Sequence, residues 1–427
     1  MDLVFAPARA LNGTVRVPGD KSVTHRAYLL ASIARGTTRI TGANAGADCL
    51  STLGALTALG ARHTLEDEGV LAIEGRPGGF VDPMHPLDLG NSGTGMRLLL
   101  GLLAGQGTKA TLVGDASLSK RPMARVVDPL RAMGAQVASA DGHAPLALDA
   151  SRLEGHAHVL RVASAQVKSC LLLAGLGARG RTAVTEPMPS RDHTERMLGA
   201  FGVPLERQGT TVALDGPVAL TSPGALAVPG DFSAAFFWLV AGSIAGEGTL
   251  TVQGVGLNPT RTGGLAVLRR MGADITSLNE RTVGGEPAGD LVVRPAPLTA
   301  TDVRPEEIPA LVDELPALAI AQACASGRSR VAGAGELRVK ESDRIAMVTQ
   351  GLRALGARAD EREGGWTIEG GGLKGGRIAT GGDHRIAMAF GIASLRAQGA
   401  VTVDEGEMID TSYPRFYSDL RDRVTSR

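Results

Sequence analysis

The sequence predicts an α/β protein of two similar domains, each built from three repeats of about 70 residues. Three observations predict this class: a hexapeptide that recurs about half a chain later, a series of polar residues before small apolar runs, and a second series of helix ends with the same spacing. The length of 427 residues suits two or three domains, because one domain usually takes about 100–200 residues.

The repeated hexapeptide marks where each domain begins. Val17–Ser22 reads Val-Pro-Gly-Asp-Lys-Ser, and Val228–Ser233 reads Val-Pro-Gly-Asp-Phe-Ser 211 residues later. Both copies lead into a small, apolar run, so the chain is expected to cross between domains at each of them. The expected N-terminal domain is 20–229, the expected C-terminal domain is 1–19 with 230–427, and the hinges lie near 19–20 and 229–230.

Each repeat is expected to contain one buried helix that starts at a polar residue. The six starts are Asp20, Asn91, Ser164, Asp231, Asp313 and Asp383, separated by 71, 73, 67, 82 and 70 residues. A buried helix start presents unpaired N–H groups and the positive end of the helix dipole, which together favour an anion. Simple N-capping by the same side chains is the alternative interpretation.

A second helix in each repeat is expected to be half-exposed. Five segments read as the end of an amphipathic helix with Gly at its C-cap, and each precedes a short β-like stretch. They are 56–61, 130–135, 198–203, 268–273 and 352–357, and the sixth copy would be the terminal helix near 416–424. Gly-Ala after a helix is common in α/β proteins, but two interleaved series with one period favour a true repeat.

Composition excludes several classes of protein. The 44 basic and 44 acidic residues leave no net charge, so nothing draws the whole molecule toward nucleic acid or an anionic membrane. The apolar stretch Ala234–Gly246 is shorter than the ~20 residues that span a bilayer, and the start of the chain lacks the pattern of a signal peptide. Cys49, Cys170 and Cys324 form no C-x-x-C motif, which favours thiols in a reducing cytoplasm.

Polar groups with catalytic potential gather at the expected helix starts. Lys21 and Arg26 follow Asp20, and other cations follow the remaining starts. The segment Glu336–Arg344 is densely charged, and Asp313 lies in an otherwise apolar stretch. Carboxylates held among cations suit acid/base work on an anionic substrate, although a solvated surface network is the plainer interpretation of the charged segment. Walker A, dinucleotide, metal-ligand and Gly-x-Ser-x-Gly spacings are absent from the sequence.

Six motifs together make the sequence recognisable. They are Pro-Gly-Asp-Lys-Ser-x-Thr-His-Arg (18–26), Leu-Gly-Asn-Ser-Gly-Thr-Gly-Met-Arg (89–97), Gly-Asp-x-Ser-Leu-x-Lys-Arg-Pro-Met (114–123), Ser-Ala-Gln-Val-Lys-Ser (164–169), Arg-Val-Lys-Glu-Ser-Asp-Arg (338–344) and Asp-His-Arg-Ile-Ala-Met (383–388). From about residue 5 to 420 the chain resembles the 3-phosphoshikimate 1-carboxyvinyltransferases, the 5-enolpyruvylshikimate-3-phosphate synthases of the shikimate pathway.

The resemblance implies a fold and a reaction. The fold would be the two-domain inside-out α/β barrel of the enolpyruvyl transferases, closing on substrate at a double-stranded hinge. The reaction would move the enolpyruvyl group of phosphoenolpyruvate to the 5-hydroxyl of shikimate 3-phosphate through a tetrahedral ketal, with phosphate released. It implies no metal or organic cofactor, a cytoplasmic monomer, glyphosate as inhibitor, and no nucleic-acid or membrane partner.

The resemblance also assigns residues to roles. Shikimate 3-phosphate would be bound by Lys21, Ser22, Arg26, Ser164, Gln166, Arg191, Asp313 and Lys340. Phosphoenolpyruvate would be bound by Lys21, Gly93, Arg121, Gln166, Arg344 and Arg385, the last two at its carboxylate. The catalytic residues would be Asp313, which takes the hydroxyl proton, Glu341, which protonates the methylene carbon, and Lys21.

Three positions depart from better-known members of that family. Ala165 replaces a second phosphate-binding Ser, Glu336 replaces Asn, and Thr411 replaces a phosphate-binding Lys. Arg191 could supply the missing positive charge. The departures resemble a second bacterial subclass with some glyphosate-tolerant members, yet Gly93 is the small residue associated with inhibitor binding, so sensitivity is expected.

Two rival interpretations remain. UDP-N-acetylglucosamine 1-carboxyvinyltransferases share the fold and the chemistry, but they usually carry a reactive Cys in the loop that here spans 114–121, where no Cys lies. An RNA-processing or RNA-binding protein could use a related repeat, but zero net charge and 3% aromatic residues oppose that function.

Overall fold

A computed structural model describes residues 1–426 and divides the chain into two compact units. Unit 1 comprises Met1–Pro18, Gly230–Thr282 and the chain from Pro287 onward, and unit 2 comprises Gly19–Pro229 with Val283–Glu286. Val283–Glu286 therefore packs with unit 2, although the sequence analysis assigned it to the other domain. The boundaries between the units fall inside the two hexapeptides, between Pro18 and Gly19 and between Pro229 and Gly230.

Three helices form the interior of unit 2, and three more cover them. The buried helices are α1 (Lys21–Ile33), α3 (Gly93–Gln106) and α5 (Ala165–Gly175), and the outer ones are α2 (Ala47–Ala58), α4 (Ala124–Ala132) and α6 (His193–Ala200). Buried helices are apolar nearly all round, as the small apolar runs predicted. The glycines that follow the outer helices have positive φ values of 87° at Gly60, 100° at Gly134 and 80° at Gly202, so they end these helices as expected.

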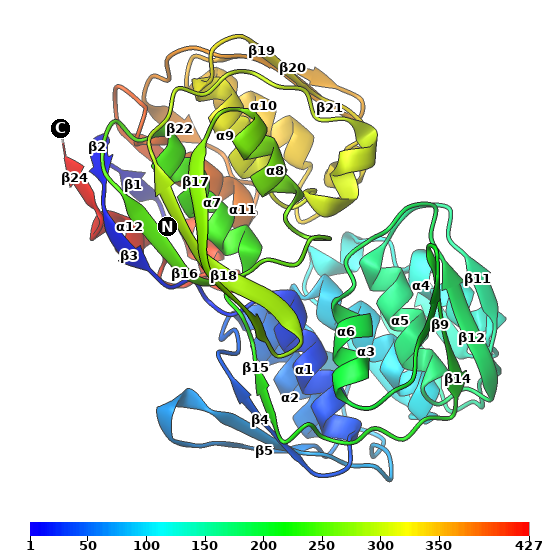
Figure 1. The fold of residues 1–427 in the computed structure, drawn as a ribbon. Helices are drawn as coiled ribbons and strands as arrows, with labels where there is room; N and C mark the ends of the chain where they lie inside the picture. The colour runs from blue at the N-terminus through cyan, green and yellow to red at the C-terminus, as the bar shows by residue number, and fades with distance from the viewer. Residues whose placement is uncertain (427) are drawn as a thin grey trace. The chain divides into compact units, whose positions relative to one another are not determined.

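Three four-stranded sheets surround these helices. Some of their strands are labelled in unit 2 of Figure 1. In each sheet a parallel edge pair continues into antiparallel strands, and this shared pattern identifies three repeats. The first sheet is β15 (Ala225–Ala227), β4 (Thr37–Thr41), β6 (Leu71–Glu74) and β5 (Arg62–Leu65). The second is β7 (Leu87–Asp88), β8 (Ala110–Val113), β10 (His143–Asp149) and β9 (Gln136–Ala140). The third is β11 (Ala157–Val159), β12 (Gly180–Thr185), β14 (Thr211–Gly216) and β13 (Glu206–Gln208).

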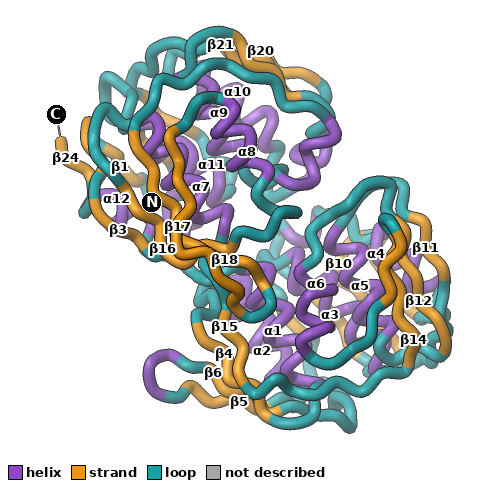
Figure 2. The backbone as a smooth tube through the Cα atoms, in the orientation of Figure 1, coloured by secondary structure: helices purple, strands orange, loops and turns teal. Residues whose placement is uncertain are grey.

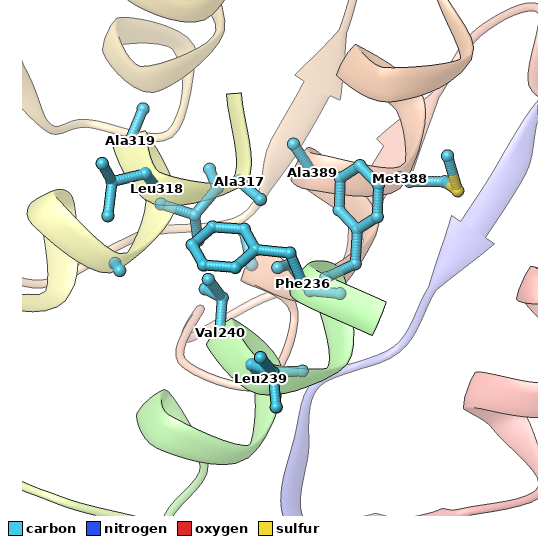
Figure 3. Close-up of a cluster of buried hydrophobic side chains, with 14 of the residues drawn as sticks. Phe236, Leu239, Val240, Ala317, Leu318, Ala319, Met388 and Ala389 are labelled. Atoms are coloured by element: carbon cyan, nitrogen blue, oxygen red, sulfur yellow. The ribbon is translucent and has the colours of Figure 1, made fainter. Parts of the chain in front are cut away.

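Unit 1 repeats this plan. Its interior helices are α7 (Phe232–Ile244), α9 (Leu315–Cys324) and α11 (His384–Ala393), and its outer helices are α8 (Gly263–Arg270), α10 (Arg344–Ala354) and α12 (Phe416–Arg421). Side chains from the three interior helices meet in one cluster, in which the Phe236 ring of α7 lies among residues of α9 and α11 (Figure 3). Small residues such as Ala317 and Ala389 in this cluster let the helices approach closely, which compensates for the low aromatic content of the chain.

Strands lie outside the helices of unit 1 as well, as the orange segments of Figure 2 show. One sheet is β3 (Gly13–Val15), β16 (Leu250–Gly256), β18 (Glu286–Arg294) and β17 (Asp274–Val283). The others are β19 (Arg328–Val331), β21 (Gly365–Glu369) and β20 (Arg358–Arg362), then β22 (Gly376–Ile378), β23 (Val401–Val403) and β1 (Leu3–Phe5). A further pair joins β2 (Ala8–Leu11) to β24 (Val424–Ser426). Helices inside and sheets outside, three repeats to each unit, confirm the predicted fold class.

Two of the six expected helix starts are displaced by one residue. Ser92 and Glu314, rather than Asn91 and Asp313, are the residues that precede α3 and α9. The other four expected starts are N-caps whose side chains accept a backbone N–H of the first turn. In the part of the chain that the structure describes, no helix is both long and apolar enough to cross a membrane.

Candidate active-site residues in each unit

The start of α1 holds the first expected cation. Lys21 is the first residue of the helix, and its Nζ forms an ion pair of 2.8 Å with Asp48 Oδ2 of α2. Both side chains are largely buried, at 13% and 8% exposure, so the ammonium is held in one place at the positive end of the helix dipole. Asp48 therefore stabilises a charge that burial and the helix dipole both oppose.

Arg26 lies one helical turn further along α1 and is fully surrounded by protein. Its Nε donates to Thr194 Oγ1 at 2.6 Å, its Nη2 to Ser169 Oγ at 2.7 Å, and its Nη1 to the Ser22 carbonyl at 2.8 Å. Burial lowers the pKa of Arg26 to about 10, which still leaves the guanidinium charged at neutral pH. Arg26 thereby joins α1 to α5 and α6, while Ser22 at the rim of α1 is half-buried.

The start of α3 brings together Gly93, Arg121 and Gln166. Arg97 Nη1 donates to Gln166 Oε1 at 2.7 Å, and Gln166 Nε2 donates to Thr94 Oγ1 at 2.8 Å. Arg121 donates through Nη1 to the Asn91 carbonyl at 3.2 Å and through Nη2 to the Asn91 side chain. A Cβ atom placed on Gly93 would lie 3.1 Å from Arg121 Nη1 and 3.2 Å from Arg97 Nη1. Glycine is therefore the residue that leaves room between the two guanidinium groups.

Ser164 and Arg191 belong to two segments of unit 2. Ser164 caps α5 through a 3.4 Å bond from the Val167 N–H, and its own N–H donates to Glu186 Oε1 at 3.1 Å. Arg191 is half-buried in the segment that leads into α6. The sequence analysis gave Glu186 no role, because an isolated Glu after a strand carries no local signal of burial.

The carboxylate of Asp313 lies among three cations in unit 1. The distances are 3.5 Å from Oδ1 to Arg344 Nη1, 3.8 Å from Oδ1 to Lys340 Nζ, and 3.7 Å from Oδ2 to Arg261 Nη1. Asp313 is 13% exposed, and Arg261 is 2% exposed. The first two cations are the ones that the resemblance assigned to substrate. Arg261 was not predicted, since an Arg in a Gly- and Thr-rich turn gives no sequence signal that it will lie beside a buried carboxylate.

A second group of charges joins Glu341 to the same cluster. Arg344 Nη2 donates to Glu341 Oε2 at 2.6 Å, and its Nε donates to Asp383 Oδ2 at 2.7 Å. Burial opposes the charge of Arg344, but the carboxylates of Asp383 and Glu341 outweigh burial and raise its pKa. Burial likewise opposes the charge of Asp383, yet Arg344 holds its pKa below the ordinary value. Arg385, whose Nη1 donates to the Asp313 carbonyl at 3.3 Å, completes the set.

The three residues that depart from better-known members of the family lie in different surroundings. Ala165 is the first residue of α5, and Thr411 is nearly buried at 9% exposure. Glu336 Oε1 lies 3.8 Å from Lys340 Nζ, so it adds a carboxylate beside a cation expected to meet substrate. In residues 1–426, no group of three or more His, Cys, Asp or Glu side chains is arranged to hold a metal ion.

Two units of three repeats each, with helices inside and sheets outside, are the fold class of the enolpyruvyl transferases. The chain belongs to the family of EPSP synthase (3-phosphoshikimate 1-carboxyvinyltransferase), whose sequence model matches residues 5–420. A 3-phosphoshikimate 1-carboxyvinyltransferase of Acidithiobacillus ferrooxidans is 52% identical over 413 residues, which cover 96% of this chain and 95% of that protein. One of Halorhodospira halophila is 52% identical over 420 residues, covering 97% and 94%.

Solved structures agree with this assignment. EPSP synthase from Acinetobacter baumannii is 42% identical, with a TM-score of 0.88 over 100% of this chain and 98% of that chain. The enolpyruvyl transferase NikO from Streptomyces tendae is 21% identical, with a TM-score of 0.77 over 99% of this chain and 98% of that chain, and supports the fold alone. The family predicted from the six motifs is therefore confirmed.

Proposed function

We propose that the chain transfers the enolpyruvyl group of phosphoenolpyruvate to the 5-hydroxyl of shikimate 3-phosphate, which gives 5-enolpyruvylshikimate 3-phosphate and phosphate. This is the shikimate-pathway step that leads toward chorismate and the aromatic amino acids. The observation that carries the proposal is the family match across residues 5–420, within which the charged motifs fold into the clusters described above.

The groups of unit 2 suit the binding of phosphates. Lys21, Arg121 and Gln166 would hold the phosphate of phosphoenolpyruvate, with Gly93 leaving space for it. Shikimate 3-phosphate would be held by Ser22, Arg26, Ser164, Gln166 and Arg191, with Ser164 at its phosphate. Helix starts favour both anions through their unpaired N–H groups and dipoles. A further charge from Arg191 would compensate for Ala165 and Thr411.

The groups of unit 1 suit the proton transfers. Asp313, whose carboxyl group lies among Arg261, Lys340 and Arg344, would accept the proton of the 5-hydroxyl as that oxygen attacks C2 of phosphoenolpyruvate. Glu341, in the form in which its carboxyl group carries a proton, would donate that proton to C3, which becomes a methyl group, and a Lys such as Lys21 could share that task. Arg344 and Arg385 would hold the carboxylate of phosphoenolpyruvate, and Lys340 would contact shikimate 3-phosphate.

The two steps balance without an external acid, base or reductant. Addition forms the C2–O bond to shikimate and gives a tetrahedral ketal that still carries the phosphate. In the second step the C2–O bond to phosphate breaks, C3 returns one proton to Glu341, and the C2=C3 double bond forms again. Asp313 can then return its proton to the departing phosphate, so both carboxyl groups regain their starting protonation states.

We also propose that the protein acts as a monomer in the cytoplasm and that glyphosate inhibits it. The thiols of Cys49, Cys170 and Cys324 support a reducing compartment, since none forms a disulfide. Gly93 supports glyphosate sensitivity, because a small residue keeps the space beside Arg121 open. An inhibition constant below the millimolar range is expected, and a millimolar constant would contradict this part of the proposal.

The direct test is phosphate release from phosphoenolpyruvate without added metal. Turnover is expected with shikimate 3-phosphate and not with UDP-N-acetylglucosamine. Turnover with UDP-N-acetylglucosamine alone, or with neither acceptor in a folded protein, would refute the proposed substrate. A matched reaction with phosphoenolpyruvate and no acceptor controls for simple phosphatase activity.

A further inference from the structure

A buried group of charges in unit 2 lies outside the proposed reaction. It consists of Lys168 on α5, Glu186 after β12 and Glu195 on α6, whose side chains are 4%, 2% and 1% exposed. The Nζ atom of Lys168 lies 2.7 Å from Glu186 Oε2 and 2.8 Å from Glu195 Oε1. Burying charged groups costs several kcal/mol for each ion unless they are paired, so this arrangement needs an explanation.

Glu186 contacts two segments that carry proposed substrate groups. Its Oε1 accepts the Ser164 N–H at 3.1 Å and the Ser190 hydroxyl at 2.5 Å. Its Oε2 accepts the Ser190 N–H at 3.4 Å as well as the ammonium of Lys168. Ser164 caps α5, and Ser190 directly precedes Arg191, so a single carboxylate ties the α5 start to the segment that carries Arg191.

Lys168 also helps to hold the start of α5 to the segment that carries Arg191. It extends from α5, one turn after Ser164, and its Nζ also donates to the Ser190 carbonyl at 3.4 Å. Ser190 is thus fixed through its N–H, its hydroxyl and its carbonyl, all by Glu186 and Lys168. By contrast, the bonds of Glu195 to this group run through Lys168 alone.

A second buried cation lies near the same group. Lys168 faces two carboxylates, and Glu195 also acts electrostatically on Arg26. Arg26 is itself held by Ser169 of α5 and Thr194 of α6. A fully buried network of paired charges and hydrogen bonds can fix two segments in one arrangement.

We propose that Glu186, held by Lys168, is a positioning residue that sets the spacing between Ser164 and Arg191 for the phosphate of shikimate 3-phosphate. Glu186 does not touch substrate in this account. It acts through the backbone of Ser164 and through Ser190. The inference rests on the proposed function, and it predicts an effect on one substrate only, which a merely structural role would not produce.

The test compares Glu186→Gln with Glu195→Gln in the full chain. Each variant neutralises one buried carboxylate on the same Lys168, but only Glu186 contacts Ser164 and Ser190. The dissociation constant of shikimate 3-phosphate is measured by titration calorimetry, and the KM of phosphoenolpyruvate by phosphate release. Thermal unfolding checks that each variant is folded.

Glu186→Gln is expected to raise the dissociation constant of shikimate 3-phosphate about tenfold, because a neutral amide weakens the charge-assisted hydrogen bonds that hold Ser164 and Ser190. The KM of phosphoenolpyruvate should change less than about twofold, and Glu195→Gln should change the dissociation constant less than about threefold. Ser190→Ala removes the hydroxyl donor without changing a charge and should also weaken shikimate 3-phosphate binding, so it serves if Glu186→Gln does not fold.

Two results would overturn the inference. One is an unchanged dissociation constant in a folded Glu186→Gln or Ser190→Ala variant. The other is an equal loss in Glu186→Gln and Glu195→Gln, which would indicate a structural role only. Failure of the wild-type chain to bind shikimate 3-phosphate would instead refute the proposed function, and this inference with it.

Discussion

Replacing Gly93 with Ala should weaken phosphoenolpyruvate binding while leaving the fold intact. The added Cβ atom would lie 3.1 Å from Arg121 Nη1 and 3.2 Å from Arg97 Nη1, where ordinary contact begins at 3.4 Å. The nearer guanidinium must therefore retreat by 3.4 − 3.1 = 0.3 Å. Both atoms are the ends of flexible side chains, so they can move without displacing the backbone.

This retreat has a calculable electrostatic cost. With an effective dielectric constant of about 20, lengthening a contact between unit charges from about 2.8 to about 3.1 Å costs about 0.6 kcal/mol. This loss falls on Arg121, because the partner that Arg97 holds at 2.7 Å is the neutral amide of Gln166. A loss of about 0.6 kcal/mol corresponds to about a threefold rise in the KM of phosphoenolpyruvate. A rise of about the same size is expected in the glyphosate inhibition constant.

The free energy of unfolding of Gly93→Ala should rise, although its binding of phosphoenolpyruvate weakens. Gly93 begins α3 and lacks a positive φ, so Ala fits its backbone and stabilises the helix by up to about 1 kcal/mol. Gly54→Ala is the matched control, because a Cβ atom at Gly54 of α2 meets nothing within 4 Å.

The effect of Gly93→Ala on the KM of phosphoenolpyruvate is measured by steady-state phosphate release at saturating shikimate 3-phosphate. The KM of phosphoenolpyruvate should rise in Gly93→Ala and stay within about twofold in Gly54→Ala. A KM for Gly93→Ala within twofold of wild type would refute the proposed place of phosphoenolpyruvate beside Arg121.

Three further predictions follow from the two units. Asp313→Asn should lower kcat by about 10²–10⁴, the usual contribution of a general base, and rapid-quench single turnovers should detect no ketal; a loss below tenfold would contradict its role. Glu341→Gln should abolish the exchange of C3 protons of phosphoenolpyruvate with solvent, whereas persistent exchange would assign the proton to another group. Burial, with Lys21 and Arg26, lowers the pKa of His25 to about 3, so below about pH 6.5 the unfolded chain binds a proton that the folded chain excludes. The free energy of unfolding should therefore fall as pH falls from 6.5 toward 3, by about 1.4 kcal/mol per pH unit from this group. Urea unfolding should show that His25→Gln lacks this contribution while the exposed His63→Gln retains it, and equal pH slopes in wild type and His25→Gln would contradict it.

The repeat could be predicted from the sequence because each copy has the same types of residue at corresponding places as well as similar spacing. Buried helices need small apolar runs, outer helices need Gly at their ends, and both signals recur in every copy. The N-cap residue was harder to predict at α3 and α9, because two adjacent polar residues lie where each helix begins. Asn91 and Asp313 were expected there, but Ser92 and Glu314 precede the helices.

The sequence predicted site residues mainly where they lie in a recognisable motif. Motif residues such as Asp313 and Arg344 are close in unit 1, although 31 residues separate them in the chain. Arg261 and Glu186 were missed, because their roles depend on burial against residues that are distant in sequence. Asp48 was missed for the same reason, since only folding brings α2 beside Lys21. Local sequence indicates which groups can do chemistry, and tertiary packing decides which groups hold them in place.

The activity proposed for this chain is the formation of an enolpyruvyl ether of shikimate 3-phosphate. The most direct measurement is to incubate the wild-type chain with phosphoenolpyruvate and shikimate 3-phosphate and to follow both products by ¹H and ³¹P NMR. We expect one equivalent of inorganic phosphate for each equivalent of 5-enolpyruvylshikimate 3-phosphate, which is identified by its vinyl protons. Phosphate release without the vinyl ether, or no consumption of phosphoenolpyruvate by folded protein, would contradict it.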